Sequence, residues 1–320
     1  MNEDKKQPIV AVVLPCYDEA LVLDSSAHRI LDLLREMTCE GLVSAESVLL
    51  MVDDGSRDNT WDTIKQISAQ NVHSHGVKLS SNRGHQNALL AGMERALDRF
   101  GADAMITIDA DLQDDPNVMK QMIRLMNEGN DVVLGVRKSR TSDSFFKRTT
   151  SHMFYRFMSW LGADVVYNHA DYRLLSRRAV EAVLQYGERN MFLRGIVNQM
   201  GFRQAKVYYD RTARTAGETK YPFKKMVNFA IDGITSFSVK PVRMVLGLGL
   251  LFILMAVFQL VYVLYSYFSN VAVSGWSSLM LSLWFVGGCI LLSLGVIGEY
   301  VAKIYIETKQ RPRFHIEDEV

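Results

Sequence analysis

The chain has 320 residues, a formal net charge of +1 and 22% charged residues. This length accommodates one large or two modest domains. The three cysteines, Cys16, Cys39 and Cys289, lack metal-ligand spacing, which fits reduced structural thiols and not a zinc or disulfide scaffold. The balanced charge gives no indication of a nucleic-acid partner, and we expect none.

The first part of the chain alternates short apolar runs with amphipathic segments. Runs of strand length span 9–14, 48–52 and 77–79, and a helical pattern follows each of them. Fully apolar strands that alternate with helices are typical of a mostly parallel sheet covered on both faces. Between each run and its helix lie short clusters: Pro15, Tyr17, Asp18 and Glu19; Asp53, Asp54, Gly55 and Ser56; and Asn82, Arg83, Gly84 and His85.

A fourth apolar run, 104–108, ends in Asp109-Ala110-Asp111-Leu112-Gln113, and a fifth, 132–136, ends at Arg137. In sheets of this kind ligands bind at the carboxyl ends of the strands. Because every polar cluster falls at such an end, we expect a nucleotide-type site there. Two carboxylates and an amide oxygen suit Mg²⁺ or Mn²⁺ and leave positions open for substrate phosphates. For an isolated Asp-x-Asp pair, the alternative to a metal site is that the two acids simply lie in a turn.

Basic and aromatic residues dominate the segment at about 144–161 and recur at 221–242. Both patterns favour amphipathic helices in the headgroup region of a membrane. For the first segment, packing on the domain's own core is the alternative. Between them, Asp171 interrupts an otherwise structural segment, and Arg211, Arg214 and Lys220 surround a glycine. The latter predicts either a mobile phosphate clamp or a solvated charged loop.

Two long uncharged stretches follow, divided by a polar turn near 269–275. Each exceeds the roughly 20 residues that cross a hydrocarbon core. We therefore predict transmembrane helices at 243–268 and 275–300, joined by a short hairpin, and a tail at 301–320. Basic residues flank the hairpin and are absent from its turn, and residues 1–8 show no signal-peptide pattern. We accordingly expect an integral protein of the cytoplasmic membrane with both termini in the cytoplasm.

The chain resembles the inverting nucleotide-sugar glycosyltransferases of GT-A fold in the order and spacing of five motifs. These are Pro15-x-Tyr17-x-Glu19, Asp53-Asp54-Gly55-Ser56, Asn82-x-Gly84, Asp109-Ala110-Asp111-Leu112-Gln113 and Asp171-x-Arg173-Leu174-Leu175. The resemblance is to the polyprenyl-phosphate glycosyltransferases, which include the bactoprenol glucosyltransferase and dolichyl-phosphate mannose synthase groups, and it covers essentially the whole chain. One departure is Asp18, where the family usually has Asn.

The resemblance implies an α/β fold: a Rossmann-like GT-A domain at 1–220 with a mostly parallel sheet, then a juxtamembrane interfacial helix at 221–242 and the two-helix hairpin. It also implies roles for individual residues. The nucleotide sugar would be bound by Pro15, Tyr17, Glu19, Asp53, Asp54, Arg83, Gly84, Asp109 and Ala110. The metal, Mg²⁺ or Mn²⁺, would be held by Asp109, Asp111 and Gln113. Asp171 matches the catalytic position, and Arg137, Arg211, Arg214 and Lys220 would bind acceptor or phosphate.

The implied activity is transfer of a hexose from a UDP-sugar, with UDP-glucose favoured, to undecaprenyl (polyprenyl) phosphate for cell-envelope glycan modification. The partners would be the donor, the lipid acceptor, the membrane and a homo-oligomer. One alternative is another donor, such as UDP-GlcNAc, GDP-mannose or UDP-aminoarabinose. Another is a non-catalytic, nucleotide-sugar-binding membrane partner. Because a phosphate monoester is largely dianionic near neutral pH, we expect Asp171 to orient groups more than to abstract a proton.

Overall fold

The computed structural model describes residues 7–137, 169–189, 193–210 and 275–320, and isolated positions between 242 and 268. The chain divides into two compact units. The first comprises Met1–Tyr155, Asp164–Pro222 and Arg311–Val320, and the second comprises Arg156–Ala163 and Phe223–Gln310.

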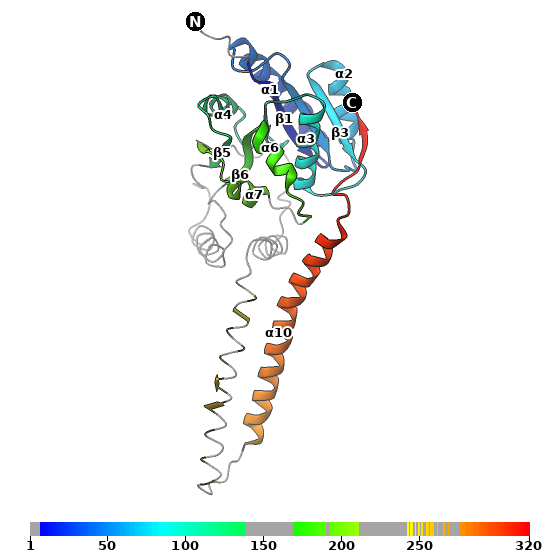
Figure 1. Cartoon of the computed structure of the whole chain (residues 1–320). Helices are drawn as coiled ribbons and strands as arrows, with labels where there is room; N and C mark the ends of the chain where they lie inside the picture. Colours follow the sequence, from blue (N-terminus) through cyan, green and yellow to red (C-terminus); the bar gives the residue numbers. More distant parts are fainter. Residues whose placement is uncertain are drawn as a thin grey trace. The chain divides into compact units, whose positions relative to one another are not determined.

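The first unit is built on a mixed sheet whose strand order is β7-β5-β6-β4-β1-β2-β3-β8 (Figure 1). The alternating apolar runs predicted a mostly parallel sheet, and the sheet has the Rossmann-like GT-A arrangement that the resemblance implied. The strands are β1 (Val10–Cys16), β2 (Val48–Asp53), β3 (Ser74–Leu79), β4 (Ala104–Thr107), β5 (Val132–Arg137), β6 (His169–Ser176), β7 (Gln204–Tyr209) and β8 (Ile316–Glu319).

Strand direction decides which residues share an edge of the sheet. β1 pairs in parallel with β2 and β4, and β2 pairs in parallel with β3. β6 is antiparallel to both β4 and β5, with Thr107 opposite Arg173. The first residues of β6 therefore lie at the edge where β4 and β5 end, which brings Asp171 to the carboxyl-end side of the sheet.

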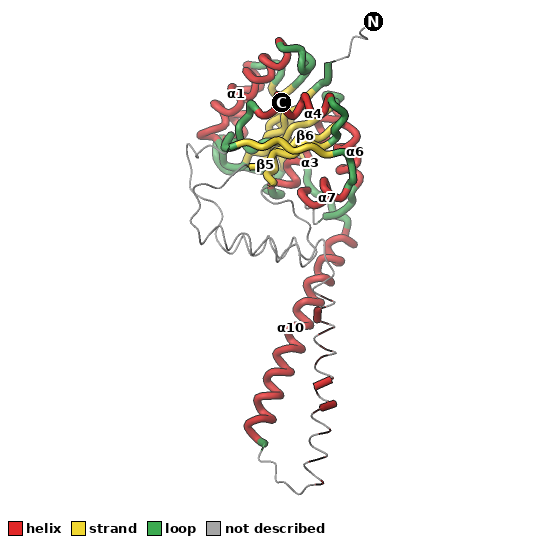
Figure 2. The backbone as a smooth tube through the Cα atoms, turned by 90° about the vertical axis from the view of Figure 1, so that its left-hand side faces the viewer, coloured by secondary structure: helices red, strands yellow, loops and turns green. Residues whose placement is uncertain are grey.

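Helices cover both faces of the sheet, as Figure 2 shows, because their apolar residues recur at helical spacing. In α1, Leu23, Ala27, Ile30 and Leu34 are buried against one face together with residues of α4. α3 packs on the other face, where Gly92 approaches Val13. The helices are α1 (Ala20–Cys39), α2 (Thr60–Gln70), α3 (His85–Asp98), α4 (Val118–Asn127), α6 (Arg177–Gln185) and α7 (Leu193–Gln199).

The last residues of the chain belong to the first unit. The sequence predicted only a tail at 301–320, whereas Ile316–Glu319 forms β8, antiparallel to β3 at the edge of the sheet. In Figure 1 the C-terminus accordingly lies beside β3. The apolar helix is thus followed by a strand that extends the sheet of the first unit next to β3.

The described part of the second unit is chiefly α10 (Trp276–Lys309), a helix of 34 residues. Within it, Phe285–Lys309 is long and apolar enough to cross a membrane, with a mean hydropathy of 1.8 and none of its most apolar stretch buried. The first predicted span, 243–268, is described only at isolated positions, which are helical. The structure therefore shows one such helix and does not show the predicted hairpin. The predicted interfacial segments at 144–161 and 221–242 lie outside the described residues, apart from Val242.

Candidate active site

The loops after β1 and β2 are fastened to each other by short polar side chains. The backbone N–H of Asp18 donates to Ser56 Oγ (3.0 Å), and Asp18 Oδ1 accepts from the N–H of Arg57 (2.8 Å). Asp18 has a φ of 52°, a conformation that Asn and Asp tolerate better than other side chains. The oxygen that Asp18 uses is also present in Asn, so the departure noted in the sequence preserves this contact.

Asp54 and Gly55 connect the loop after β3 to the loops after β1 and β2. The buried Asp54 carboxylate accepts from the backbone N–H groups of Arg83 (2.6 Å) and Gly84 (2.9 Å). Gly55 has a φ of 66°, and a Cβ there would lie 2.6 Å from the backbone nitrogen of Asn82. The carboxylate of Asp54, predicted to contact the nucleotide, thus holds the loop that precedes α3.

The other predicted nucleotide-side residues lie around this junction. Pro15 is buried in β1, Tyr17 is half-buried, and Glu19 is the N-cap of α1, where its N–H donates to Thr60 Oγ1 (3.0 Å). Arg83 is exposed.

Asp53 is fully buried at the end of β2 and keeps one oxygen unsatisfied. Oδ1 accepts from the N–H of Ser56 (3.0 Å), whereas the buried Oδ2 has no hydrogen-bond partner in the structure. Burial raises the pKa of Asp53, and the hydrogen bonds from Ser56 oppose this. An unsatisfied buried acceptor is costly, so this oxygen suits a donor group supplied by a ligand.

The turn after β4 carries two carboxylates and an amide. Gln113 Nε2 donates to Asp111 Oδ2 (2.7 Å), and the Gln113 N–H donates to Oδ1 of the same group (3.3 Å). A carboxylate only accepts, so the amide nitrogen faces Asp111 and the amide oxygen is the atom of Gln113 that could ligate a cation. Leu112, with a φ of 44°, tightens the turn. Ala110 between the two acids is buried.

Asp171 is clamped between two guanidinium groups. Arg194 binds it through both oxygens, with Nε to Oδ1 at 3.1 Å and Nη2 to Oδ2 at 2.7 Å, and Arg173 Nη2 binds Oδ1 from behind. The Arg173 side chain is fully buried, while that of Arg194 is 29% exposed. Burial alone would raise the pKa of Asp171, but Arg194 and Arg173 outweigh it and hold this pKa well below its ordinary value.

His85, the first residue of α3, lies between the two carboxylate groups of the site. Its Nε2 is 3.8 Å from Asp109 Oδ1 and 3.7 Å from Asp171 Oδ2. Burial raises the pKa of Asp109, His85 opposes this, and Asp171 adds to it. Asp109 and Asp171 thus converge on the same nitrogen of His85, and the Asp109 side chain, which is 43% exposed, is accessible to a cation.

Arg137 is tied to a different acid from those predicted for the site. Its Nε and Nη2 bind Asp114 at 3.1 and 3.2 Å, and Asp114 is buried. Arg137 therefore anchors the end of β5 to the turn after the aspartate motif. The other three predicted phosphate-binding residues, Arg211, Arg214 and Lys220, lie outside the described residues.

Sequence reasoning missed Arg194 and gave His85 no role. Arg194 lies in the short helix α7, and its pairing with Asp171 depends on folding over 23 residues. The sequence did contain one signal for an ion pair here. Arg173 lies among apolar residues of an expected strand, and a buried arginine requires an acid beside it, which is Asp171.

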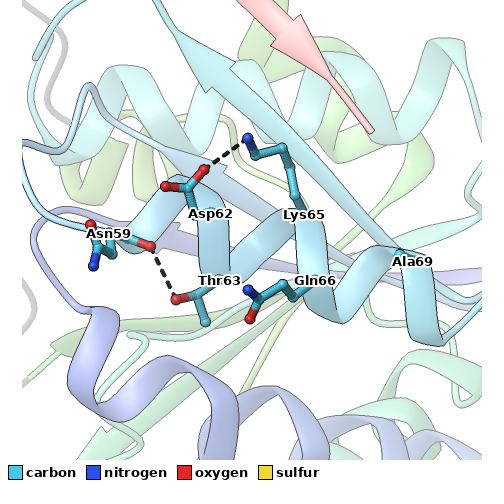
Figure 3. Close-up of a pocket in the computed structure, with 6 residues that line it drawn as sticks. All are labelled: Asn59, Asp62, Thr63, Lys65, Gln66 and Ala69. Atoms are coloured by element: carbon cyan, nitrogen blue, oxygen red, sulfur yellow. Dashed lines mark hydrogen bonds and ion pairs between the residues drawn. The ribbon is translucent and has the colours of Figure 1, made fainter.

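A depression along α2 lies apart from this cluster (Figure 3). It measures about 690 Å³ and is lined by one helix and its N-cap, including Asn59, Asp62 and Lys65. Asp62 and Lys65 form an ion pair at 2.8 Å within it. It is wide open and its charges neutralise each other, so we place the candidate active site at the edge of the sheet and not here.

Comparison with known proteins identifies the family of the chain. The profile described as Glycosyl transferase family 2 matches residues 11–184, more than half of the chain. The chain belongs to glycosyl transferase family 2. The match runs from β1 through α6 and so includes the aspartate turn, His85 and Asp171, which confirms the family that the motifs indicated.

Proteins named as glycosyltransferases resemble the chain, two of them over nearly its whole length. "Uncharacterized glycosyltransferase YkoT" of Bacillus subtilis (strain 168) is 46% identical over 98% of this chain and 92% of its own. "Bactoprenol glucosyl transferase" of Shigella phage SfX is 34% identical over 96% of this chain and 98% of its own. Among solved structures, glucosyl-3-phosphoglycerate synthase from Mycobacterium tuberculosis in complex with Mn²⁺ and UDP-glucose is 18% identical, with a TM-score of 0.46 over 71% of this chain and 77% of that one.

Proposed function

We propose that this family 2 chain is a membrane-anchored, inverting hexosyltransferase that moves the sugar of a UDP-sugar, foremost UDP-glucose, to polyprenyl phosphate. The observation that carries the proposal is the convergence of Asp109 and Asp171 on one nitrogen of His85, at 3.8 and 3.7 Å. The diphosphate of the donor would lie at the turn 109–113, here called the aspartate turn. The second reactant would lie beside Arg194, the cationic side chain that pairs with Asp171. Relatives named bactoprenol glucosyl transferase support polyprenyl phosphate as that reactant.

The nucleotide would lie over the fastened loops after β1 and β2. Tyr17 and Glu19 border this region, and the unsatisfied Asp53 Oδ2 would accept a hydrogen bond from the base or ribose. Holding the base here directs the diphosphate along the edge of the sheet toward Asp109 and Asp111.

A divalent cation fits the donor set of the aspartate turn. Among the residues that the structure describes, no three acidic, histidine or cysteine side chains gather as a closed metal site. Mg²⁺ and Mn²⁺ are commonly held by one or two carboxylates together with substrate phosphates. Asp109, Asp111 and the amide oxygen of Gln113 would hold it, and when bound it neutralises charge on the departing diphosphate.

The acceptor side would be organised by Asp171 and Arg194. A strongly lowered pKa makes Asp171 a weak base, since efficient general bases have a pKa near the working pH. The acceptor phosphate hardly needs one because its second pKa is about 6. We assign Asp171 the task of orienting Arg194, which would in turn contact the phosphate.

The reaction is then a single displacement. A phosphate oxygen of the acceptor forms a bond to the anomeric carbon while the bond from that carbon to the β-phosphate oxygen breaks. The nucleoside diphosphate leaves with the bonding electron pair from the opposite face of the sugar, so the configuration inverts.

Membrane anchoring rests on α10. Its Phe285–Lys309 portion has the length and apolarity of a membrane span, and large apolar side chains such as Leu283, Leu291 and Ile304 are exposed. An anchored enzyme meets a lipid acceptor at the headgroup level, which a freely diffusing one does not. Placement of the catalytic domain and both termini in the cytoplasm, and assembly into a homo-oligomer, remain predictions from the sequence.

A donor screen tests the proposal. The full-length protein is incubated with undecaprenyl phosphate, Mn²⁺ or Mg²⁺ and one radiolabelled donor at a time: UDP-glucose, UDP-GlcNAc, GDP-mannose or UDP-aminoarabinose. We expect label from UDP-glucose to enter the lipid phase only when metal and acceptor are both present. Donor binding without any release of UDP would instead identify a non-catalytic sugar-nucleotide partner, and label from another donor alone would correct the sugar.

A further inference from the structure

The edge of β3 and the basic side of α3 are occupied by the chain's own C-terminus. β8 pairs with β3 in antiparallel register, with Val77 opposite Glu319 and Lys78 opposite Asp318. Gly76 and Val320 exchange two backbone hydrogen bonds, at 2.9 and 3.0 Å, and Ser80 donates to the carbonyl of His315 at 2.9 Å. Val320 also packs beside the hydrophobic core.

Charge complementarity makes this pairing specific for an acidic strand. Glu319 forms ion pairs with Arg95 of α3 (2.7 Å) and with Arg99, the C-cap of that helix (3.5 Å). Glu317 forms an ion pair with Lys78 of β3 at 3.0 Å. β8 therefore joins β3 and α3, the two elements on either side of the loop 80–84.

That loop leads into the candidate active site. Its first residue, Ser80, is bonded to His315, its last residues are held by Asp54, and His85 begins α3 directly after it. Without β8, β3 would be an edge strand with unpaired backbone groups, and edges of sheets open locally more readily than their centres. Strain or fraying at β3 would then be transmitted to the loop and to His85.

We propose that residues 315–320 are a positioning element for the donor side of the active site, docked by strand addition on β3 and by the charge pairs with α3. Only five residues, Arg311–His315, separate the C-cap of α10 from this strand. The chain thus returns from its apolar helix to brace the loop beside the nucleotide. The inference rests on the proposed function only for the choice of UDP as ligand.

The decisive comparison is between the full-length protein and a chain that ends at Phe314, which keeps α10 intact. We expect the shortened chain to stay in the detergent-extracted membrane fraction and to bind UDP with Mn²⁺ about 2- to 30-fold more weakly, the range of coupling found for contacts outside a binding site. Hydrogen exchange at Gly76 and Ser80 should accelerate by at least about tenfold, and the acceleration should extend to 81–85.

A peptide of residues 311–320 supplied in trans should restore UDP affinity to the shortened chain, while a scrambled peptide should not. If the shortened chain folds and its UDP affinity and exchange at 81–85 equal those of the full-length protein, the proposal is overturned, and β8 merely covers an edge.

Should the shortened chain fail to fold, full-length point variants decide. Glu319→Arg reverses the charge that faces Arg95 and Arg99. Asp318→Arg makes the same change at an exposed neighbour whose carboxylate accepts from the N–H of Glu319. We expect weaker UDP binding for Glu319→Arg alone, with recovery on adding Arg95→Glu. Equal affinity in both single variants contradicts the proposal. A full-length protein that binds no UDP would refute the donor assignment, and exchange at 81–85 would still decide the role of β8.

Discussion

The substitution Asp171→Asn distinguishes two roles for this residue: a carboxylate that orients Arg194, and a general base. The substitution preserves shape but removes the negative charge that pairs with Arg194 and with the fully buried Arg173. Removing one partner of a buried ion pair costs about 3–5 kcal/mol. We expect about 3 kcal/mol here because Asp171 is 19% and Arg194 29% exposed, which corresponds to a Tm lower by about 6–12 °C for a domain of this size.

The pH dependence of this difference follows from the direction of the pKa shift. The folded pKa of Asp171 lies below the unfolded value of about 3.9. Its stabilisation is therefore fully present above the unfolded pKa and is lost as the pH falls through the folded pKa. The difference in Tm between the wild type and Asp171→Asn should be constant from pH 8 to about 5. It should become smaller only in stronger acid.

A control at an exposed ion pair is Asp62→Asn, which breaks the pair with Lys65. Both side chains are well exposed, at 64% for Asp62 and 46% for Lys65, so this change should cost about 1 kcal/mol or less. Transfer by Asp171→Asn should fall by up to about 100-fold through misplaced Arg194, with the same pH profile as wild type. A stability gap that narrows between pH 7 and 5, or an acid limb present in wild type and absent in the variant, would show that Asp171 is a base poised near neutrality.

Three further substitutions test other parts of the site. Gly55→Ala should lower the free energy of unfolding, measured in urea, by at least about 2 kcal/mol, because it adds a backbone clash to the cost of a positive φ. Its control is Gly101→Ala, where φ is 58° and no atom lies near the added Cβ. This change should cost only about 1 kcal/mol in the same measurement. Asp18→Asn should keep UDP affinity within about twofold by calorimetry, since its oxygen still accepts from Arg57, and a loss beyond about tenfold would assign the charge itself to nucleotide binding. Asp109→Asn should abolish Mn²⁺ binding in the presence of UDP, measured by electron paramagnetic resonance, while wild-type Mn²⁺ affinity in this variant would remove Asp109 from the ligand set.

The parallel part of the sheet was predictable because local signals agree there. Each apolar run ends in a cluster with its own chemical character, and ligand sites in such sheets lie at strand ends. This placed Asp53, Asp109 and Asp111 at one edge without any knowledge of the structure. The role of Asp171 as a site residue was implied by the resemblance to the family, and the antiparallel direction of β6 explains why the start of this strand lies among strand ends.

What the sequence did not reveal depends on long-range pairing. Arg194 meets Asp171 only after α7 has been positioned, partly by the bond from its first N–H to Gln86 Oε1 (2.9 Å). β8 pairs across nearly 240 residues, and its acidic, weakly apolar sequence is not typical of a strand. A chain cut after Lys240 would lose β8 together with α10, so we expect its donor binding to weaken as in the chain that ends at Phe314.

The length of α10 has a consequence for the proposed anchoring. At about 1.5 Å per residue, its 34 residues extend for about 51 Å, against a hydrocarbon core of about 30 Å. About 20 Å of rigid helix therefore stands clear of the lipid tails, and the charged residues Glu299, Lys303, Glu307 and Lys309 cluster toward one end of it. Inserting or deleting one turn of α10 would therefore change the distance of that end from the hydrocarbon core by about 5 Å.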